Sequence, residues 1–309
     1  MLNVRHLEIF RTVVQTGSVS AAGRMLYISQ PAVTKTLRLL EGELGLTLFQ
    51  RVKGRLVCTP EADALMPEVE RLFGSVESVR QAALEIRQGV RGRITVASVS
   101  ALSMSVVAQA VSAFHQRHPQ VQFDVRALPT RHVVEYVGTS QVDMGIVDVP
   151  TPAASLEVEE ICKSEVVCVL HRDHALARHT RLTPELLADW PIITFADDTF
   201  TGFRLREAFR ERGVPYDTAL VSNSTGTLCA MVRALNAVAL VDHFILMTSA
   251  FPQLVLRRFS PRIDMQPRFL FSPMRPRSAI VAQFADAIRT AARTAVRRLS
   301  RPGRQTDPG

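Results

Sequence analysis

Residues 17–45 read GSVSAAGRMLYISQPAVTKTLRLLEGELG, a pattern that predicts two short helices joined by a tight turn at Tyr27-Ile28. Ser18 and Ser29 are placed to cap the two helices. Pro31 is tolerated in the first turn of the second helix, because its missing N–H would have no partner there. The inward stripe of the second helix is apolar: Val33, Leu37, Leu40 and Leu44. The pattern indicates a helix-turn-helix, which lays its second helix in the major groove of DNA.

The outward face of the second helix carries groups suited to DNA. Thr34 can reach a base edge or a methyl group, and Lys35 and Arg38 can reach guanine edges or phosphates. Residues 48–59, LFQRVKGRLVCT, predict two short strands that form a basic wing. Any single cation is also explained as solvated surface charge, but the whole set favours a winged helix-turn-helix. The predicted DNA-binding residues are Ser29, Gln30, Pro31, Thr34, Lys35, Arg38, Arg51, Lys53 and Arg55.

Charge is concentrated at the two ends of the 309-residue chain, whose net charge is +8. Residues 1–60 hold eight Lys or Arg against three Asp or Glu, and residues 287–309 hold six Arg against one Asp. This distribution suits a polyanionic partner. No uncharged apolar run is long enough to cross a membrane, and the opening MLNVRHLEIF is charged where a signal peptide would be apolar. We therefore expect a cytoplasmic protein without a membrane partner.

Metal and cofactor chemistry finds no support in the sequence. The four cysteines are scattered without C-x-x-C spacing. The histidines at 171, 174 and 179 have no acid or thiol nearby that completes a ligand set. Neither a Gly-rich phosphate loop nor a G-x-S-x-G elbow is present. We expect no metal, no cofactor and no enzymatic activity.

A long helix is predicted to begin at Thr59-Pro60-Glu61 and to end before Gly89. Its apolar positions are spaced alternately by four and three residues, which is the heptad seam of a coiled coil. They are Leu65, Val69, Leu72, Val76, Val79, Ala83 and Ile86. Such a seam needs a partner, which can be a second copy of the chain or another part of its own chain.

From Arg93 onward, strand and helix patterns alternate, which is typical of an α/β domain. Residues 143–147 and 166–170 are continuous apolar runs of the kind found in strands buried on both faces. A solute-binding protein without a DNA-binding role would explain this region, but it would leave the N-terminal motif and the missing signal peptide unexplained.

The N-terminal residues resemble the LysR-type transcriptional regulators. The matching stretches are Arg5-His6-Leu7-Glu8-Ile9-Phe10, Gly17-Ser18 with Ala21-Ala22, Ser29-Gln30-Pro31-Ala32-Val33-Thr34-Lys35, Leu39 with Glu41, Gly45, and Leu48-Phe49 with Arg51. The resemblance implies DNA contacts at the matched positions and pairing of two linker helices into a homodimer or homotetramer on promoter DNA. Lys35 departs from the arginine more usual in the family, so the bidentate fork is lost at that position.

The resemblance also implies the domain order. We expect a winged helix-turn-helix domain over residues 1–59, a linker and dimerisation helix over 60–88, and a two-lobed, periplasmic-binding-protein-like effector domain over 92–299. Lobe one is expected at 92–164 and 268–299, and lobe two at 165–267, with a disordered tail at 300–309.

A small-molecule effector is expected between the lobes, where strand ends and helix N-termini favour anions. The candidate contacts are Ser100, Leu102, Thr130, Arg131, Asp148, Thr199, Thr201, Arg204, Ser224 and Asp242. Residues 165–170 and 224–234 are most similar to regulators of diaminopimelate-lysine metabolism and of octopine- or nopaline-type opines. This likeness suggests an amino-acid-like ligand, with its carboxylate at helix N-termini and Arg131 or Arg204 and its amine at Asp148 or Asp242.

Overall fold

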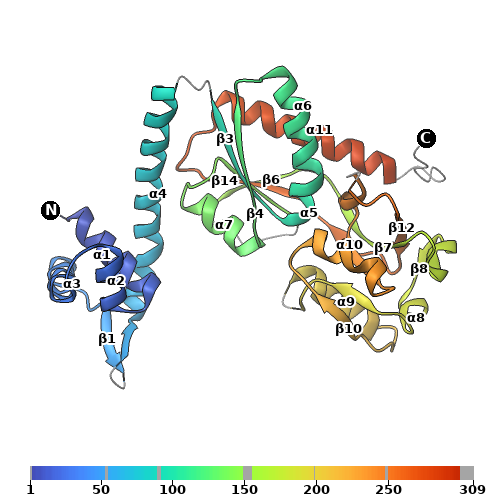
Figure 1. Ribbon diagram of the computed structural model, residues 1–309, viewed down its shortest axis with the longest axis horizontal. Helices are drawn as coiled ribbons and strands as arrows, with labels where there is room; N and C mark the ends of the chain where they lie inside the picture. Colours follow the sequence, from blue (N-terminus) through green and yellow to red (C-terminus); the bar gives the residue numbers. More distant parts are fainter. Residues whose placement is uncertain are drawn as a thin grey trace. The chain divides into compact units, whose positions relative to one another are not determined.

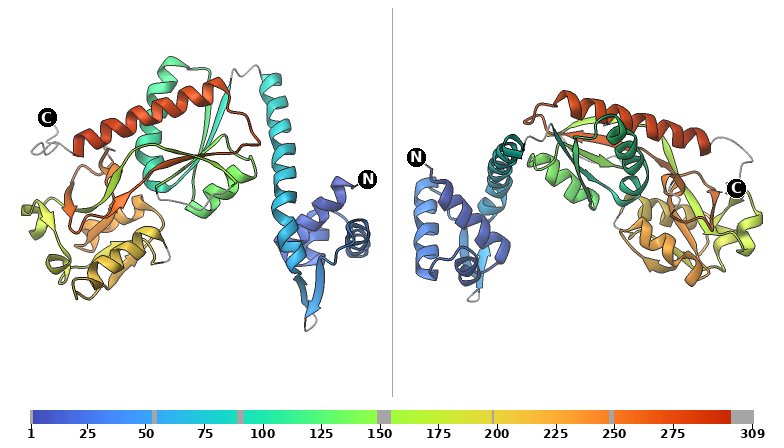
Figure 2. Two further views of the ribbon diagram at one scale, coloured as in Figure 1. Left: turned by 180° about the vertical axis from the view of Figure 1, so that it is seen from behind. Right: turned by 45° about the horizontal axis from the view of Figure 1, so that its top comes forward.

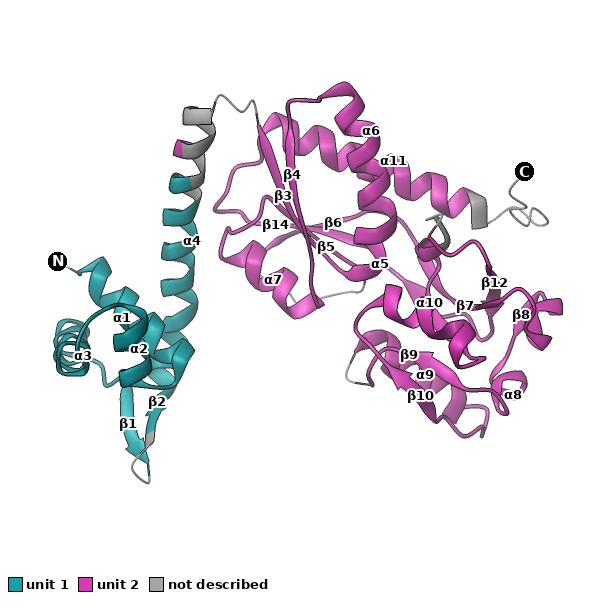
Figure 3. Ribbon diagram, viewed as in Figure 1, with its two compact units in different colours: residues 1–82 teal, residues 83–309 magenta. Residues whose placement is uncertain are grey.

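The computed structural model describes residues 2–52, 55–88, 92–148, 155–197, 199–247 and 250–299. The chain forms two compact units, residues 1–82 and residues 83–309 (Figure 3). The tail predicted at 300–309 lies outside the described residues. No helix in the described ranges is long and apolar enough to cross a membrane.

Unit 1 is a helix-turn-helix followed by a two-stranded wing. Its elements are α1 (Val4–Thr16), α2 (Val19–Met25), α3 (Gln30–Leu44), β1 (Phe49–Val52) and β2 (Arg55–Cys58). The predicted caps are confirmed, because the hydroxyls of Ser18 and Ser29 accept hydrogen bonds from the backbone N–H groups of Ala21 and Ala32. β1 and β2 pair antiparallel, as the basic wing requires.

The next helix, α4 (Pro60–Gln88), packs its first half against its own unit. Leu65, Val69 and Leu72 of the predicted seam contact the core of the helix-turn-helix, and Val69 is only 2% exposed. Val69 is therefore taken up by its own chain, whereas Leu65 and Leu72 are only half-buried there, and pairing of the seam with a second copy stays a prediction. Val76 and Val79 are 50% and 71% exposed. The side chain of Ile86 is outside the described set.

An ion pair fixes α4 to α1. Both oxygens of Glu70 accept from the Arg11 guanidinium, at 2.8 Å from Nε and 2.7 Å from Nη2, in the bidentate arrangement that arginine makes with carboxylates. Arg11 also lies over the ring of Phe73, 5.1 Å from its centroid. The start of α4 is thus a structural part of unit 1.

Unit 2 contains two sheets. The first has the strand order β4-β3-β5-β14-β6, in which β4, β3 and β5 are parallel (Figure 1). Its strands are β3 (Arg93–Ser98), β4 (Gln122–Ala127), β5 (Met144–Val147), β6 (Glu157–Glu160) and β14 (Arg268–Phe271). α6 (Ala108–Arg117) and α11 (Ala279–Leu299) lie side by side on one face, and α7 (Thr130–Gly138) covers the other (Figures 1 and 2). The predicted α/β architecture is confirmed.

The second sheet has the order β10-β9-β11-β7-β12-β8, with β13 paired to β7. Its strands are β7 (Ser164–His171), β8 (Arg181–Leu182), β9 (Ile192–Thr194), β10 (Thr218–Val221), β11 (Val238–Asp242), β12 (Leu254–Phe259) and β13 (Asp264–Met265). α9 (Phe200–Arg210) covers one face, and α10 (Thr225–Ala234) covers the other. Two short helices, η2 (Ala175–Arg178) and α8 (Pro184–Leu187), complete the first of these layers.

The two sheets meet at a short helix, η3 (His243–Met247). η3 contacts α5 (Ser100–Leu102), η1 (Ser103–Val107) and α11 from the first sheet, and β7 and β12 from the second. Phe244 belongs to the core of the first sheet, while the next residue, Ile245, belongs to the core of the second. η3 therefore couples the two halves of unit 2.

Candidate DNA-binding face and effector site

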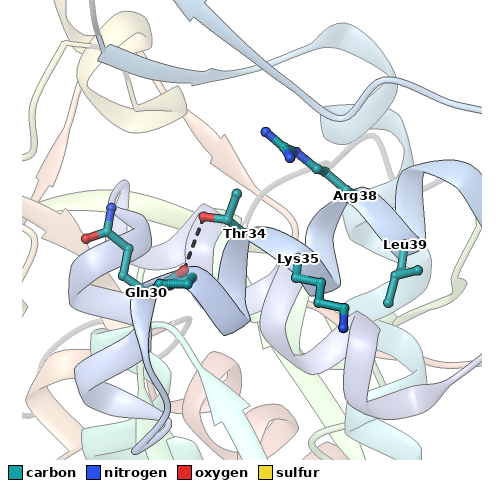
Figure 4. Close-up of a pocket in the computed structure, with 6 residues that line it drawn as sticks. Gln30, Thr34, Lys35, Arg38 and Leu39 are labelled. Carbon is teal, nitrogen blue, oxygen red and sulfur yellow. Dashed lines mark hydrogen bonds between the residues drawn. The ribbon is translucent and has the colours of Figure 1, made fainter.

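The outer face of α3 presents the predicted DNA-binding side chains together. Gln30, Pro31, Thr34, Lys35, Arg38 and Leu39 line one surface hollow on this helix (Figure 4). Gln30, Lys35 and Arg38 are exposed, while Thr34 is half-buried. The hydroxyl of Thr34 donates to the Gln30 carbonyl at 3.1 Å, which leaves its methyl group to contact a base.

A close approach between α2 and the following turn sets the position of α3. A Cβ atom on Gly23 would lie 2.8 Å from the backbone carbonyl oxygen of Ile28, so only glycine fits without movement. Tyr27 adopts a left-handed backbone, φ 55°, and its side chain is 95% exposed in the turn. The side chains of Ser20 and Gln30 are hydrogen-bonded across the two helices at 3.0 Å.

Glu41 joins α3 to the wing, a role the sequence analysis missed. Its Oε1 accepts from the backbone N–H groups of Leu48 at 2.8 Å and Phe49 at 3.2 Å. Arg51 on β1 is exposed, as a phosphate contact requires. The predicted contacts at Lys53 and at the side chain of Arg55 fall outside the described structure.

We expect Glu41→Ala to lower the free energy of unfolding of unit 1 by about 2 kcal/mol, because the buried N–H of Leu48 loses a charged acceptor. Glu41→Gln is the matched control, since its amide oxygen can still accept both bonds, and it should lose much less. Chemical denaturation followed by circular dichroism measures the difference. Equal losses in the two variants would show that the carboxylate does not hold the wing through these bonds.

Three predicted effector residues lie at one edge of the first sheet. Ser100 follows β3, Thr130 follows β4 and Asp148 follows β5, and these strands are parallel neighbours. The carboxyl ends of parallel strands meet at one edge, where open α/β sheets bind ligands. α5 and α7 begin after Val99 and Pro129, which supply no side-chain cap, so first-turn N–H groups remain open to an anion.

The second sheet repeats this arrangement. α9, with Thr199 and Thr201, follows β9. Ser224 follows β10, and Asp242 ends β11, again on parallel neighbours. The two edges approach each other where α5 contacts α10 and where Met104 packs against Gly226. The sheet edges that carry the predicted residues thus meet where α5 contacts α10.

Several of these side chains are already engaged within the fold. Thr199 and Ser224 cap α9 and α10 by accepting from the N–H groups of Gly202 and Thr227. Thr201 is buried, and its hydroxyl faces the sulfur of Met265 at 3.8 Å. Leu102 is also buried, whereas Arg131 and Arg204 are exposed. Ser100, Thr130 and Asp148 are half-buried.

Asp242 differs from the other charged candidates because it is 1% exposed. Its Oδ2 accepts from the Ser164 hydroxyl at 2.9 Å, and its Oδ1 accepts from the backbone N–H of Phe244 at 2.9 Å. Burial and, to a smaller extent, the nearby Asp148 together raise the pKa of Asp242 to about 7. Burial also raises the pKa of Asp148, to about 6.

The histidines set aside as metal ligands have other surroundings. His174 is buried against Trp190, with ring centroids 4.3 Å apart. Burial lowers the pKa of His174. Within the described ranges, no group of three or more His, Cys, Asp or Glu is placed to hold a metal ion.

Two family descriptions match this architecture. Residues 4–63 match the bacterial regulatory helix-turn-helix protein, lysR family, and residues 87–293 match the LysR substrate binding domain. The chain belongs to the LysR family. This regulator is 30% identical over 284 residues to the transcriptional activator protein LysR of Escherichia coli K12, covering 92% of this chain and 91% of that protein.

Other relatives support the same assignment for this LysR-family regulator. It is 27% identical over 266 residues to the octopine catabolism/uptake operon regulatory protein OccR of Rhizobium meliloti, covering 85% of this chain and 87% of that protein. Its fold matches CbnR, a LysR family transcriptional regulator, with a TM-score of 0.66, 18% identity, and coverage of 94% of this chain and 99% of CbnR. CbnR complexed with its target DNA gives the same TM-score.

The LysR-family regulator therefore combines a DNA-binding helix-turn-helix with an effector-binding domain. Because residues 4–63 match the DNA-binding family, the alternative of a solute-binding protein without a DNA-binding role is not favoured. The family is one of transcriptional regulators.

Proposed function

We propose that this regulator acts in the cytoplasm and reads promoter DNA with the outer face of α3. The observation that carries the proposal is the shared exposure of Gln30, Lys35 and Arg38 on one helix face, beside the methyl group of Thr34. Arginine and lysine pair with guanine edges, and a threonine methyl group pairs with that of thymine. Arg51 on the wing contacts phosphates and contributes affinity without sequence preference.

Arg38→Ala is expected to weaken specific binding by about 1–3 kcal/mol if its guanidinium reads a base. Arg51→Ala should weaken specific and non-specific binding alike and lower the salt slope by about one unit. Binding isotherms on operator and random DNA at several salt concentrations separate the two effects. Arg117→Ala, an exposed arginine on α6, is the control. If neither variant lost more affinity for DNA than the control, α3 and the wing would not form the DNA interface.

The exposed half of the seam on α4 supports pairing with a second copy. Val76 and Val79 are large apolar side chains that the described part of their own chain leaves exposed. They continue the heptad spacing that begins at Leu65. Pairing there buries both valines and gives the regulator two helix-turn-helix segments for two half-sites.

The effector of the proposed regulator is a small amino acid or an opine-like anion. The uncapped first turns of α5 and α7 and the hydroxyls of Ser100 and Thr130 suit a carboxylate at the sheet edge. Asp148 at the same edge suits an ammonium or guanidinium group. The relative OccR regulates, by its name, octopine catabolism and uptake, which is consistent with such a ligand.

Thermal unfolding followed by the fluorescence of Trp190 tests this ligand class, because Trp190, the sole tryptophan, packs in unit 2. A ligand at 100 times its dissociation constant should stabilise the domain by about 2.7 kcal/mol. Amino acids, diaminopimelate and opines form the panel. Ser100→Ala and Thr130→Ala should remove most of the shift, and Ser112→Ala, at an exposed position on α6, should not. Binding that survives both would place the ligand elsewhere.

A further inference from the structure

The junction between the two sheets of unit 2 contains a buried polar cluster formed by Ser164, Asp242 and His243. The Ser164 hydroxyl lies 2.9 Å from Asp242 Oδ2 and 2.8 Å from His243 Nδ1. All three residues are buried, and Nε2 of His243 has no hydrogen-bond partner among the described residues. Ser164 begins β7, where the chain enters the second sheet, and His243 begins η3, which contacts both sheets.

We propose that Asp242 and Asp148 form a proton-or-cation latch: the two sheets hold together at this junction when one positive charge, a proton or a cationic group of the effector, compensates the two carboxylates. In this role Asp242 is a positioning residue, because its oxygens are occupied by Ser164 and the N–H of Phe244. Asp148, half-buried at the end of β5, is the carboxylate that a ligand can reach. Compensation by a cationic group rests on the effector proposed above, whereas compensation by a proton does not.

The hydrogen-bond chain accommodates both charge states. With Asp242 ionised, His243 donates from Nδ1 to Ser164, which donates to Asp242. One added proton reverses both bonds: Asp242 donates to Ser164, which donates to Nδ1, and the imidazole hydrogen then resides on Nε2. His243 stays neutral throughout, consistent with burial lowering its pKa to about 4.

Backbone contacts connect Asp148 to Ser164 of the hydrogen-bonded cluster. The backbone N–H of Gln266 donates to the Asp148 carbonyl at 3.1 Å, and the preceding residue, Met265, pairs with Ser164. Ionising Asp242 in its buried site is costly, and the charge of Asp148 adds to that cost. The raised pKa of Asp242, about 7, reflects burial first and Asp148 second.

Among the described residues, no cationic side chain lowers the pKa of Asp242 or of Asp148, so their charge is not compensated by the protein itself. Cys162, before β7, is a thiol whose pKa burial raises to about 12, with Asp242 contributing. α5, η1 and β9 contain no charged residue. The arginines of the adjoining strands and helices contact other groups: Arg233 contacts Gln253, Arg257 the Ala177 carbonyl, Arg258 Glu165, Arg268 Gln266, and Arg289 Glu159 and Asp286.

The sign of the pH effect follows from the direction of the shift. Asp242 has a higher pKa in the closed junction than in water, so protonated Asp242 stabilises the closed form at low pH, and this stability is lost as pH rises towards 7. Between pH 5 and pH 8 the equilibrium should move towards the open junction by up to roughly a hundredfold if opening hydrates the carboxylate fully.

Hydrogen exchange of the full-length protein, corrected for the chemical rate, measures this opening in the segments around 162–167 and 240–245. In the wild type without effector, we expect protection to fall between pH 5 and pH 8. Asp242→Asn should make protection nearly independent of pH, because its amide can donate to Ser164 as the protonated acid does. Ser164→Ala should move the midpoint to higher pH, because ionised Asp242 loses a donor. Asp189→Asn, on an exposed turn, should behave as wild type.

A flat wild-type profile overturns the proposal, as does an Asp242→Asn variant with the wild-type pH dependence. If Asp242→Asn does not fold, an unmoved midpoint in Ser164→Ala overturns the proposal instead.

A second experiment tests compensation by a cationic group and compares L-lysine with L-norleucine at pH 8. L-lysine should restore protection in the wild type, and L-norleucine, which lacks the terminal amine, should not. Restoration of protection by both amino acids would show that a cationic group does not compensate the carboxylates. If L-lysine does not restore protection, compensation by a cationic group fails, while the thermal-unfolding panel decides the effector class and the pH profiles decide compensation by a proton.

Discussion

Replacing Val76 and Val79 together by glutamate is expected to lower the affinity of the regulator for its operator by about two to four orders of magnitude. The size of the loss follows from avidity: a paired molecule engages its second half-site at an effective concentration near the millimolar range, and a single chain does not. Four carboxylates in one apolar seam would prevent the pairing. Light scattering should show smaller particles, and binding isotherms should show the loss.

The double variant distinguishes a loss of pairing from a loss of folding. Val76 and Val79 are exposed on the single chain, so the double variant should keep the unfolding transition of unit 1. Leu72→Glu, by contrast, would insert a charge against the chain's own core and should lower that transition. Met274→Glu, at a position 73% exposed in unit 2, is the control for an added surface charge. Intact pairs with unchanged operator affinity in the double variant would mean that α4 is not the seam.

The second large effect is expected at Gly23. Gly23→Ala should lower the free energy of unfolding of unit 1 by ~2 kcal/mol, because its Cβ would meet the Ile28 carbonyl at 2.8 Å and force the turn away from α2. Gly42→Ala is the matched control in α3: nothing lies within 4 Å of its Cβ, and alanine should stabilise the helix by about 0.5–1 kcal/mol.

Two optical signals locate the Gly23 effect. Circular dichroism at the helix band reports on both units, whereas the fluorescence of Trp190 reports on unit 2 alone. Gly23→Ala should lower the first unfolding transition seen by circular dichroism and leave the Trp190 transition in place. Equal stability of the Gly23 and Gly42 variants would contradict the close approach of α2 and the turn.

The N-terminal unit could be predicted closely from the sequence because its signals are local. Ser18 and Ser29 cap helices within three residues of themselves, and Gly17 and Gly45 end helices with left-handed backbones. The buried strands β5 and β7 of unit 2 could be predicted from their continuous apolar runs at 143–147 and 166–170, but not that β7 pairs antiparallel with β11 and β12. Ser100 and Thr130 could be expected in the effector site from the family resemblance, and the structure places them with Asp148 at one edge of the first sheet.

The parts that sequence could not supply depend on distant contacts. Heptad spacing in α4 shows that a partner exists but not which one, and the structure gives Leu65, Val69 and Leu72 to the chain's own core. Asp242 could be expected near the effector, but its burial depends on Ser164, 78 residues earlier in the chain. Burial through such distant contacts decides whether a carboxylate can bind a ligand or instead positions neighbouring groups.

The central claim is that the outer face of α3 reads sequence in duplex DNA. The most direct measurement is a footprint on DNA from the region upstream of the gene, with competitor DNA, for the wild type and for the combined Thr34→Ala, Lys35→Ala and Arg38→Ala variant. The wild type should protect a discrete site at least about a thousandfold more tightly than random DNA. The triple variant should retain non-specific binding and lose that preference. Protection of the same site by the triple variant, with an unchanged preference over competitor, would contradict the claim.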